Sequence, residues 1–271
     1  MEDGSHAASE HHAADPRGSH LQQSQLEMRV ILHADDLGIS SVVNESVFCL
    51  LDEGRLTSAS ILANGPEFRE AARLSKFFPH CSFGMHLNLT EFAPLLPSAG
   101  LAPFLSSDGS FQRKAIPLRL DGQVQRAVVK EWRAQIACLR NAGVTISHID
   151  SHHHIHTRLA LLPCLLEVCA EEKIDRVRLR HTFTGNEALS RWRIDNLLYN
   201  WTLRQSFTCT DEFGPLLAYV KGPHRLPESC TAELMVHPGH ENYSQETSAL
   251  TYCGSRDFLS QHERISYLDL N

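Results

Sequence analysis

The sequence predicts an α/β protein in which strands and helices alternate to form an irregular β/α barrel. Short apolar runs rich in β-branched residues alternate with segments whose apolar residues recur at helical spacing. Such alternation indicates parallel strands, because parallel strands need helices to cross between them. About six or seven strand–helix units fit into the 271 residues, and a single-domain barrel commonly needs about 250 residues.

The first unit illustrates the pattern. Residues 28–34 form an apolar run typical of a buried strand, and residues 35–38 follow as a turn. A helix then begins after Ser40 or Ser41, since serine is a favoured N-cap. Gly54 is predicted to end that helix, because glycine adopts the left-handed conformation found after helix ends.

The same reasoning extends along the chain. Further strands are predicted at 56–62, 82–89, 144–149, 176–179, 232–236 and 265–268. Further helices are predicted at 66–77, 124–141, 159–172, 188–205 and 255–263. An irregular, proline-containing segment from 90 to 121 is expected to overlie one end of the barrel.

Composition also indicates the domain organisation, the class of partner and the localisation of the protein. Residues 1–27 are polar and are expected to be disordered or tag-like, which leaves 28–271 as a single catalytic domain. The net charge of −7 argues against a nucleic-acid partner. No run approaches the roughly 20 apolar residues of a transmembrane segment. The polar N-terminus lacks a secretory signal, so a cytoplasmic protein is expected, and a homodimer is left open.

Ionisable residues gather where predicted strands end. They are Asp35, Asp36, His86, Asp150, His152, Arg178 and His237. In β/α barrels the carboxyl ends of the strands form one mouth that carries the catalytic groups. Aspartate and histidine are good ligands for a divalent cation, and three protein ligands leave coordination positions open for water and substrate.

Taken singly, each of these residues has a simpler interpretation. A histidine near a strand end is often a packing residue, and an Asp-Asp pair is often part of a helix cap. Residues 151–156 could be a solvated loop. Their occurrence on consecutive strand ends favours a metal site. Asp35 and Asp36 are neighbours, which point to opposite faces of a regular strand, so both can serve the site only where the strand ends.

Several short motifs resemble one family. The motifs are 33–38 (HADDLG), 84–90 (GMHLNLT), 148–156 (HIDSHHHIH) and 233–239 (ELMVHPG), with 54–58 and 62–65 in support. In this order and spacing the chain resembles the YdjC-like carbohydrate deacetylase family. The resemblance implies an irregular barrel related to polysaccharide deacetylases, and hydrolysis of an acetamido group on an oligosaccharide or other small sugar substrate.

The resemblance also implies roles for individual residues. It places the metal ligands at Asp36, His86 and His152, the general base at Asp35 and the general acid at His237. Magnesium is the metal expected from the family, while a ligand set with two histidines also suits zinc. The base would accept a proton from the attacking water, and the acid would protonate the departing amine.

Other residues receive supporting roles from their positions. Arg178 is expected to pair with Asp35 and keep it ionised, and Asp150 is expected to orient a ligand histidine. His154 and His156 either contact substrate or lie on plain surface. Phe92, Phe104 and Phe111 in the irregular segment either stack on a sugar or form a small satellite core.

Two alternatives to a sugar deacetylase stay open from the sequence. Barrel and ligands also fit metal-dependent hydrolysis of another amide or ester bond. The second is a non-catalytic carbohydrate-binding relative, which would be expected to have lost a ligand or the base. The departures from the family pattern, at His33 and Leu37, put the identity of the substrate in doubt rather than the ligands.

Overall fold

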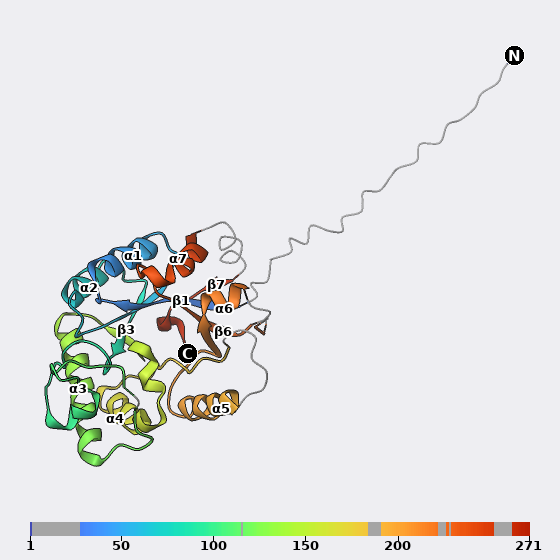
Figure 1. The fold of residues 1–271 in the computed structure, drawn as a ribbon. Helices are drawn as coiled ribbons and strands as arrows, with labels where there is room; N and C mark the ends of the chain where they lie inside the picture. Colours follow the sequence, from blue (N-terminus) through green and yellow to red (C-terminus); the bar gives the residue numbers. More distant parts are fainter. Residues whose placement is uncertain (2–27, 115, 184–190, 222–225, 228, 252–261) are drawn as a thin grey trace.

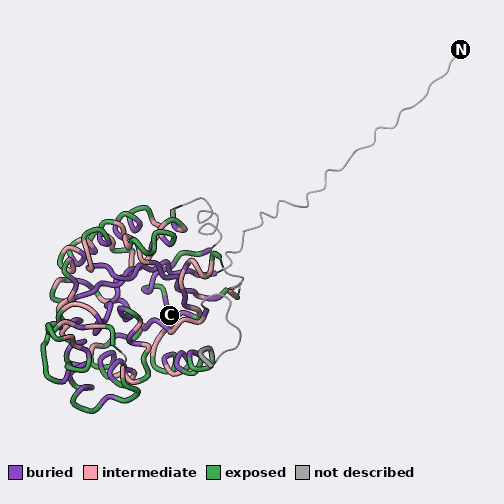
Figure 2. Tube along the Cα trace, in the orientation of Figure 1, coloured by how far each residue is buried: buried purple, intermediate pink, exposed green. Residues whose placement is uncertain are grey.

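The computed structural model describes Met1 and residues 28–114, 116–183, 191–221, 226–227, 229–251 and 262–271. Within these residues, parallel strands form one curved sheet in the order β4-β3-β2-β1-β6-β5, with β7 beside β1. Helices lie outside the strands, and the buried backbone follows the curved sheet (Figures 1 and 2). The α/β barrel predicted from the sequence is therefore confirmed.

The elements follow the chain in alternation. The strands are β1 (Arg29–Leu37), β2 (Ser58–Ile61), β3 (Ser82–Leu87), β4 (Ile146–Ser151), β5 (Glu212–Pro215), β6 (Thr231–Val236) and β7 (Glu263–Arg264). The helices are α1 (Ser41–Asp52), α2 (Phe68–Ser75), α3 (Gly122–Asn141), α4 (Leu162–Glu172), α5 (Arg191–Arg204), α6 (Leu216–Lys221) and α7 (Ser244–Thr251). Ser40 caps α1, since its side-chain oxygen accepts the Val43 N–H, and Gly54 follows that helix with φ of 65°.

An irregular segment completes the ring between β4 and β5. The Arg178 N–H donates to the Ile149 carbonyl of β4 at 3.0 Å, and the Val177 N–H donates to the Thr208 carbonyl at 3.3 Å. Further along, the Thr182 N–H donates to the Phe213 carbonyl of β5 at 2.9 Å. The strand predicted at 176–179 is thus present only as isolated bridges, yet it fixes the backbone that carries Arg178.

Some predicted elements differ from the structure. β5, α6 and α7 were not predicted: β5 and α6 are only four and six residues long, and β5 contains glycine and proline. The strand predicted at 265–268 is wrong: the pairing residues are Glu263–Arg264, and a 3-10 turn covers Tyr267–Asp269. The helix predicted at 255–263 falls on residues 255–261, outside the described residues, and ends in β7. The tag-like segment predicted at 1–27 also lies outside them, apart from Met1.

The C-terminal residues fill the barrel at the amino ends of its strands. Tyr267 is fully buried, and its ring stacks on His148 with the centroids 3.6 Å apart. β7 pairs with the first residues of β1, whereas β2 pairs with β1 from His33 onward. The chain end lies amid the strands in Figure 1. This end of the barrel is therefore closed, and the opposite end is left for a site. No described helix is long and apolar enough to cross a membrane.

Candidate active site

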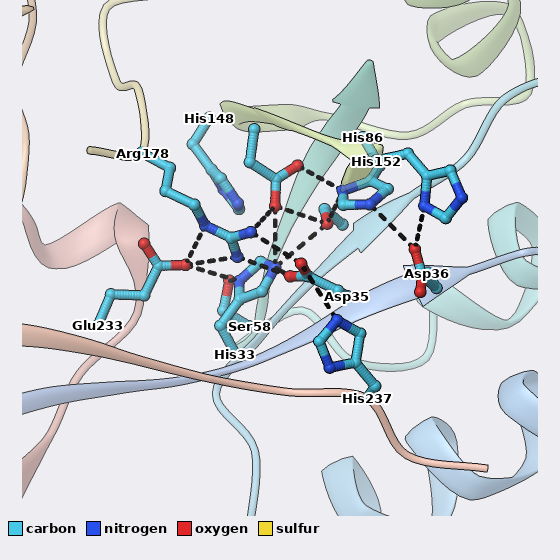
Figure 3. Close-up of polar contacts among 12 residues, drawn as sticks. His33, Asp35, Asp36, Ser58, His86, His148, His152, Arg178, Glu233 and His237 are labelled. Carbon is cyan, nitrogen blue, oxygen red and sulfur yellow. Dashed lines mark hydrogen bonds and ion pairs between the residues drawn. The ribbon is translucent and has the colours of Figure 1, made fainter. Parts of the chain in front are cut away.

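The carboxyl ends of the strands bring the predicted residues together. β1 carries Asp35 and Asp36, β3 carries His86, β4 carries Asp150, and His152, Arg178 and His237 follow from neighbouring segments. In Figure 3, Asp36 faces His86 and His152, while Asp35 lies between Arg178 and His237. The two halves of the site meet at the Asp35–Asp36 pair.

A distortion of β1 lets both adjacent aspartates serve the site. The pairing of β1 with β2 shifts register between Ala34 and Leu37. Within this irregularity Asp36 adopts φ of 67°, in the left-handed region that residues other than glycine rarely occupy. Asp35 is 2% exposed and Asp36 is 5% exposed, so neither side chain turns to solvent. Strain of this kind is often retained where function requires it.

Asp36, His86 and His152 form a buried group that fits a cation. One ligand atom from each lies within 4.8 Å of the others. Oδ1 of Asp36 is 3.1 Å from Nε2 of His86 and 2.7 Å from Nδ1 of His152. Nε2 of His86 is buried and, apart from this contact with Asp36, has no polar partner. A buried imidazole nitrogen directed at a carboxylate is the arrangement expected of two ligands of one cation.

The electrostatics of this group favour positive charge. Burial alone would lower the pKa of His86, but the Asp150 carboxylate and the two aspartates of β1 raise it to about 10. Burial likewise opposes the charge on Asp36, yet contacts from His152, His240 and His86 keep its pKa well below the usual value. Surroundings that favour a protonated imidazole also favour a bound cation, which fits a divalent metal ion.

His86 and His152 each have a further carboxylate at the second ring nitrogen. Nδ1 of His86 lies 2.8 Å from Oδ1 of Asp150. Nε2 of His152 lies 2.9 Å from Oε2 of Glu91. Carboxylates that hold the second ring nitrogen fix the orientation of a ligand and raise its basicity. Asp150 therefore lies where the sequence analysis expected an orienting residue, and Glu91 adds a partner that it did not identify.

Arg178 is buried among three carboxylates. Its two Nη atoms lie 3.0 and 2.7 Å from the two oxygens of Asp35. Nη1 is also 2.8 Å from Asp150, and Nε is 2.8 Å from Glu233. Burial of charge without partners is very costly, so this cluster depends on the guanidinium being present. Burial raises the pKa of Asp35, but the positive charges of Arg178, His86 and His33 together outweigh burial and lower the pKa to about 2.

His237 lies on the other side of Asp35. Nε2 of His237 is 3.9 Å from Oδ2 of Asp35, and Nδ1 is 3.1 Å from Glu246 of α7. The His237 N–H also donates to Glu246 at 2.7 Å, and the imidazole stacks on Tyr243 at 4.4 Å. Burial lowers the pKa of His237, but the carboxylates of Glu246, Asp35 and Asp36 together outweigh burial and the pKa rises. The imidazole thus lies between Glu246 and Asp35.

His154 and His156 occupy different places. His156 is fully buried, with Ser151 at one ring nitrogen and the Arg178 carbonyl 3.1 Å from the other, so it supports the backbone of Arg178. His154 lines a cavity of about 360 Å³ with the His181 and Phe213 rings. The guanidinium of Arg178 lies 4.7 Å from the centre of the Phe213 ring, so this cavity adjoins the buried cluster.

A larger hollow lies away from this chemistry. It measures about 770 Å³ and is lined by residues at the amino ends of the strands, among them Gly54, Thr57 and Cys81. Catalytic groups of β/α barrels sit at the other end, so we assign the site by its residues and not by cavity size. Phe104 and Phe111 are 3% and 4% exposed, so of the two alternatives for these residues the structure supports packing in the core and not stacking on a sugar.

Several residues of the site were not identified from the sequence. Glu91 follows the 84–90 motif directly, and His240 lies three residues after His237 with its Nε2 3.2 Å from Oδ2 of Asp36. Glu233 was noted only as part of a motif, although it bonds Arg178. Proximity to a motif could have suggested Glu91 and His240. Glu246 carries no local signal, because the loop after β6 brings it back to His237.

Sequence comparison places the chain among known proteins. The model of the YdjC-like protein family matches residues 29–266. A carbohydrate deacetylase of Geobacillus stearothermophilus is 30% identical over 226 residues, which cover 83% of this chain and 85% of that protein. A carbohydrate deacetylase of Oceanobacillus iheyensis is 33% identical over 147 residues, which cover 54% of this chain and 63% of that protein. The latter match thus spans less than two thirds of the relative.

A solved structure supports the same placement. The crystal structure of a candidate cellobiose-phosphate cleavage protein from Enterococcus faecalis superposes with a TM-score of 0.69 at 22% identity. The match covers 89% of this chain and 98% of that one. At this identity the likeness concerns the fold, and it agrees with the irregular barrel described above. With a family model that matches nearly the whole described domain, the chain belongs to the YdjC-like protein family.

Proposed function

We propose that this protein is a metal-dependent hydrolase that removes the acetyl group from an N-acetylated sugar. The observation that carries the proposal is that two groups of residues lie side by side at the carboxyl end of β1. A buried Asp-His-His group that fits a cation adjoins an aspartate paired with Arg178. Relatives named carbohydrate deacetylase support the reaction and the class of substrate.

Asp36, His86 and His152 would hold the metal. Nitrogen donors suit zinc, cobalt or nickel better than magnesium, which prefers oxygen, so the magnesium expected from the family is one arm of the test. A divalent cation here would lower the pKa of water and polarise the acetyl carbonyl. Asp150 and Glu91 keep the two imidazoles turned toward Asp36.

Asp35 is proposed as the general base. Its carboxylate is ionised at neutral pH because Arg178, together with His86 and His33, lowers its pKa to about 2, and it is fixed by two hydrogen bonds. The same pairing weakens Asp35 as a base, so its contribution depends on position more than on basicity. One of its oxygens lies within 4.8 Å of a ring nitrogen of His86, so a water bound beside the metal group would be close to Asp35.

His237 is proposed as the general acid. An amide is cleaved only when the departing nitrogen receives a proton. The raised pKa of His237 favours the protonated ring, and the contact with Glu246 fixes the direction of the imidazole. The ring lies on the side of Asp35 away from Arg178, as Figure 3 shows, so base and acid flank the same space.

The cavity beside the cluster is proposed to receive the sugar. It is lined by the half-buried ring of His181, which stacks on Phe213 with the centroids 4.8 Å apart, and by the polar side chains of Arg180 and Asn196. Rings that bind the apolar face of a sugar, with a few polar groups at their edges, are typical of small-molecule sites. His154 is part of this lining, in keeping with the substrate contact considered for it.

Acetate release tests the proposal. The protein is stripped of metal with a chelator, supplied with zinc, cobalt or magnesium, and incubated with N-acetylglucosamine oligomers. We expect acetate only with a restored metal, and loss of both bound metal and acetate in Asp36→Ala. Asp52→Ala, an exposed aspartate of α1, is the matched control. Sugar binding without acetate in every metal would identify a non-catalytic relative. Release from other amides or esters alone would identify another hydrolase.

A further inference from the structure

Helix α5 presents apolar side chains to solvent. The exposed fractions are 54% for Ile194, 56% for Leu197, 62% for Leu198 and 63% for Trp201. Residues spaced by three, four and seven positions lie on one side of a helix, so these four form a stripe. The opposite side of α5 is buried and packs on the core through Tyr199 and Leu203, with the polar Asn196 and Asn200 beside them. The helix thus carries apolar side chains on both sides, and the stripe faces away from the core.

Hydrogen bonds fix α5 in this orientation. The Asn200 side chain accepts the Arg180 N–H at 2.8 Å and donates to the Arg180 carbonyl at 3.0 Å. The Asn196 side chain donates to the His181 carbonyl at 3.0 Å. Rotating the stripe inward would leave these backbone groups buried without partners, which costs about 1–3 kcal/mol for each. The stripe is therefore a stable feature of the surface.

Two loops extend the apolar stripe. Leu118 is 89% exposed and Leu159 is 64% exposed. Both line a hollow of about 430 Å³ together with Leu198 of α5. We call Leu118, Leu159, Ile194, Leu197, Leu198 and Trp201 the apolar face. Contiguous apolar surface of this kind on a folded protein marks a site of interaction.

Positive charge surrounds the apolar face. Arg158 and Arg180 line the hollow, and Asp195 is the one acidic side chain in that lining. Exposed cations flank Leu118 in the chain, namely Arg113, Lys114 and Arg119. The whole chain has a net charge of −7, so this cationic region runs against the overall balance. Its charge is complementary to an anionic partner.

We propose that the apolar face docks on the surface of an anionic lipid bilayer. Leucine and tryptophan side chains that enter the acyl boundary, with arginine and lysine at the level of the headgroups, are how peripheral proteins bind such surfaces. A second copy of the chain fits less well, because a two-fold axis through the face would oppose its cations to one another. Arg158, Arg180 and Asp195 also line the cavity beside the active site, so docking turns that cavity toward the membrane.

Vesicle binding tests the docking independently of any catalysis. The full chain is sedimented with vesicles of equal parts phosphatidylglycerol and phosphatidylcholine, and with phosphatidylcholine alone. We expect binding to the anionic vesicles that weakens with salt, and quenching of tryptophan emission by brominated lipid. The double variant Leu197→Ser/Trp201→Ser should bind roughly tenfold or more weakly, because two apolar anchors are lost. Arg119→Glu should also weaken binding.

Matched controls lie elsewhere on the surface. Phe77→Ser removes an apolar side chain that is 71% exposed after α2, and Arg73→Glu reverses a charge on α2, far from α5 in Figure 1. Both should bind as the wild type does. Equal binding by the wild type and the double variant would overturn the proposal, as would failure of the wild type to bind anionic vesicles. A wild-type dimer that the double variant converts to monomer would assign the face to self-association instead.

Discussion

Arg178 and Asp35 form a buried, two-bond ion pair at the centre of the site, with Nη2 2.7 Å from Oδ1 and Nη1 3.0 Å from Oδ2. Arg178 comes from the irregular segment that closes the barrel, and Asp35 comes from β1. The pair therefore joins the two sides of the ring. Arg178, which keeps the proposed base Asp35 ionised, thus also connects β1 to the part of the barrel that is held only by isolated bridges.

Replacing Arg178 should destabilise the fold as well as the site. Arg178→Met would leave Asp35, Asp150 and Glu233 buried without their shared cation. Removing one partner of a buried pair typically costs about 3–5 kcal/mol of unfolding free energy. Arg178→Lys keeps the charge but cannot form two parallel bonds, so it should lose less. Urea unfolding of the three proteins measures this order. A Met variant as stable as the wild type would show that the cluster does not depend on Arg178.

Glu91 should affect metal affinity without contacting the metal. Its carboxylate lies 2.9 Å from Nε2 of His152, on the side away from Asp36. Loss of such an orienting partner typically weakens metal binding by about 10–100-fold. Glu91→Ala should show this loss in a calorimetric zinc or cobalt titration, while Glu45→Ala, an exposed glutamate of α1, should not. Unchanged affinity in Glu91→Ala would mean that His152 needs no orientation by Glu91.

The effect of replacing His237 on kcat should depend on whether the leaving group of the substrate needs a proton. His237→Gln removes the proposed acid, and loss of general acid catalysis typically lowers kcat by about 10²–10⁴. The KM and the bound metal should change little, because the ring lies 3.9 Å from Asp35 and outside the Asp36 group. Substrates whose leaving group needs no proton, such as a nitrophenyl acetate, should lose much less. Equal losses for both substrates would contradict the acid role.

His156 should make the metal-free protein less stable in acid. Burial lowers the pKa of His156 to about 4. Above pH 6.5 the ring is neutral in both states; below it the unfolded chain binds a proton that the folded protein refuses, so stability falls as pH drops toward 4. A gap of about 2.5 pH units corresponds to at most ~3.4 kcal/mol.

Urea unfolding at several pH values measures this effect. His156→Gln should be less stable at neutral pH, because the variant loses the hydrogen bonds of the imidazole to Ser151 and to the Arg178 carbonyl. Its stability should nevertheless decline less steeply between pH 6.5 and 4, by up to about 1.4 kcal/mol per pH unit. A wild type and a variant with the same slope would show that His156 titrates normally.

Much of the fold could be read from local patterns. Strand 28–34 and the helix between Ser40 and Gly54 follow from apolar periodicity and capping, and the structure has both. The sequence could not predict that β1 continues through Asp36, because that depends on a register shift against β2 and a left-handed residue. β5 and α6 were missed because they are short and are defined by their neighbours rather than by periodicity.

The residues of the candidate site also fall into those that the sequence predicts and those that it does not. Strand-end placement predicted that Asp36, His86 and His152 would meet, because parallel strands end at one edge. The bond between Glu246 and His237 joins β6's loop to α7, which the sequence analysis did not recognise as a helix. The contact of Tyr267 with Glu233 likewise joins residues 34 positions apart without a local pattern. Such partners follow from tertiary packing alone.

Tyr267 offers a test of how far the site depends on the closed end of the barrel. Its hydroxyl donates to Oε2 of Glu233, whose other oxygen bonds Arg178, and its ring stacks on His148. Tyr267→Phe removes only the hydroxyl, and hydrogen bonds to charged groups contribute about 1.5–3 kcal/mol. Tyr267→Ala also removes the buried ring, so a loss of about 3–5 kcal/mol is expected.

Leu268→Ala, at a neighbouring exposed position, is the matched control. Thermal and urea unfolding should find the control most stable, Tyr267→Phe less stable and Tyr267→Ala least stable, since Tyr267 fills the barrel beneath Arg178. A Tyr267→Ala protein as stable as the control would mean that the C-terminal residues do not support the buried charges around Arg178.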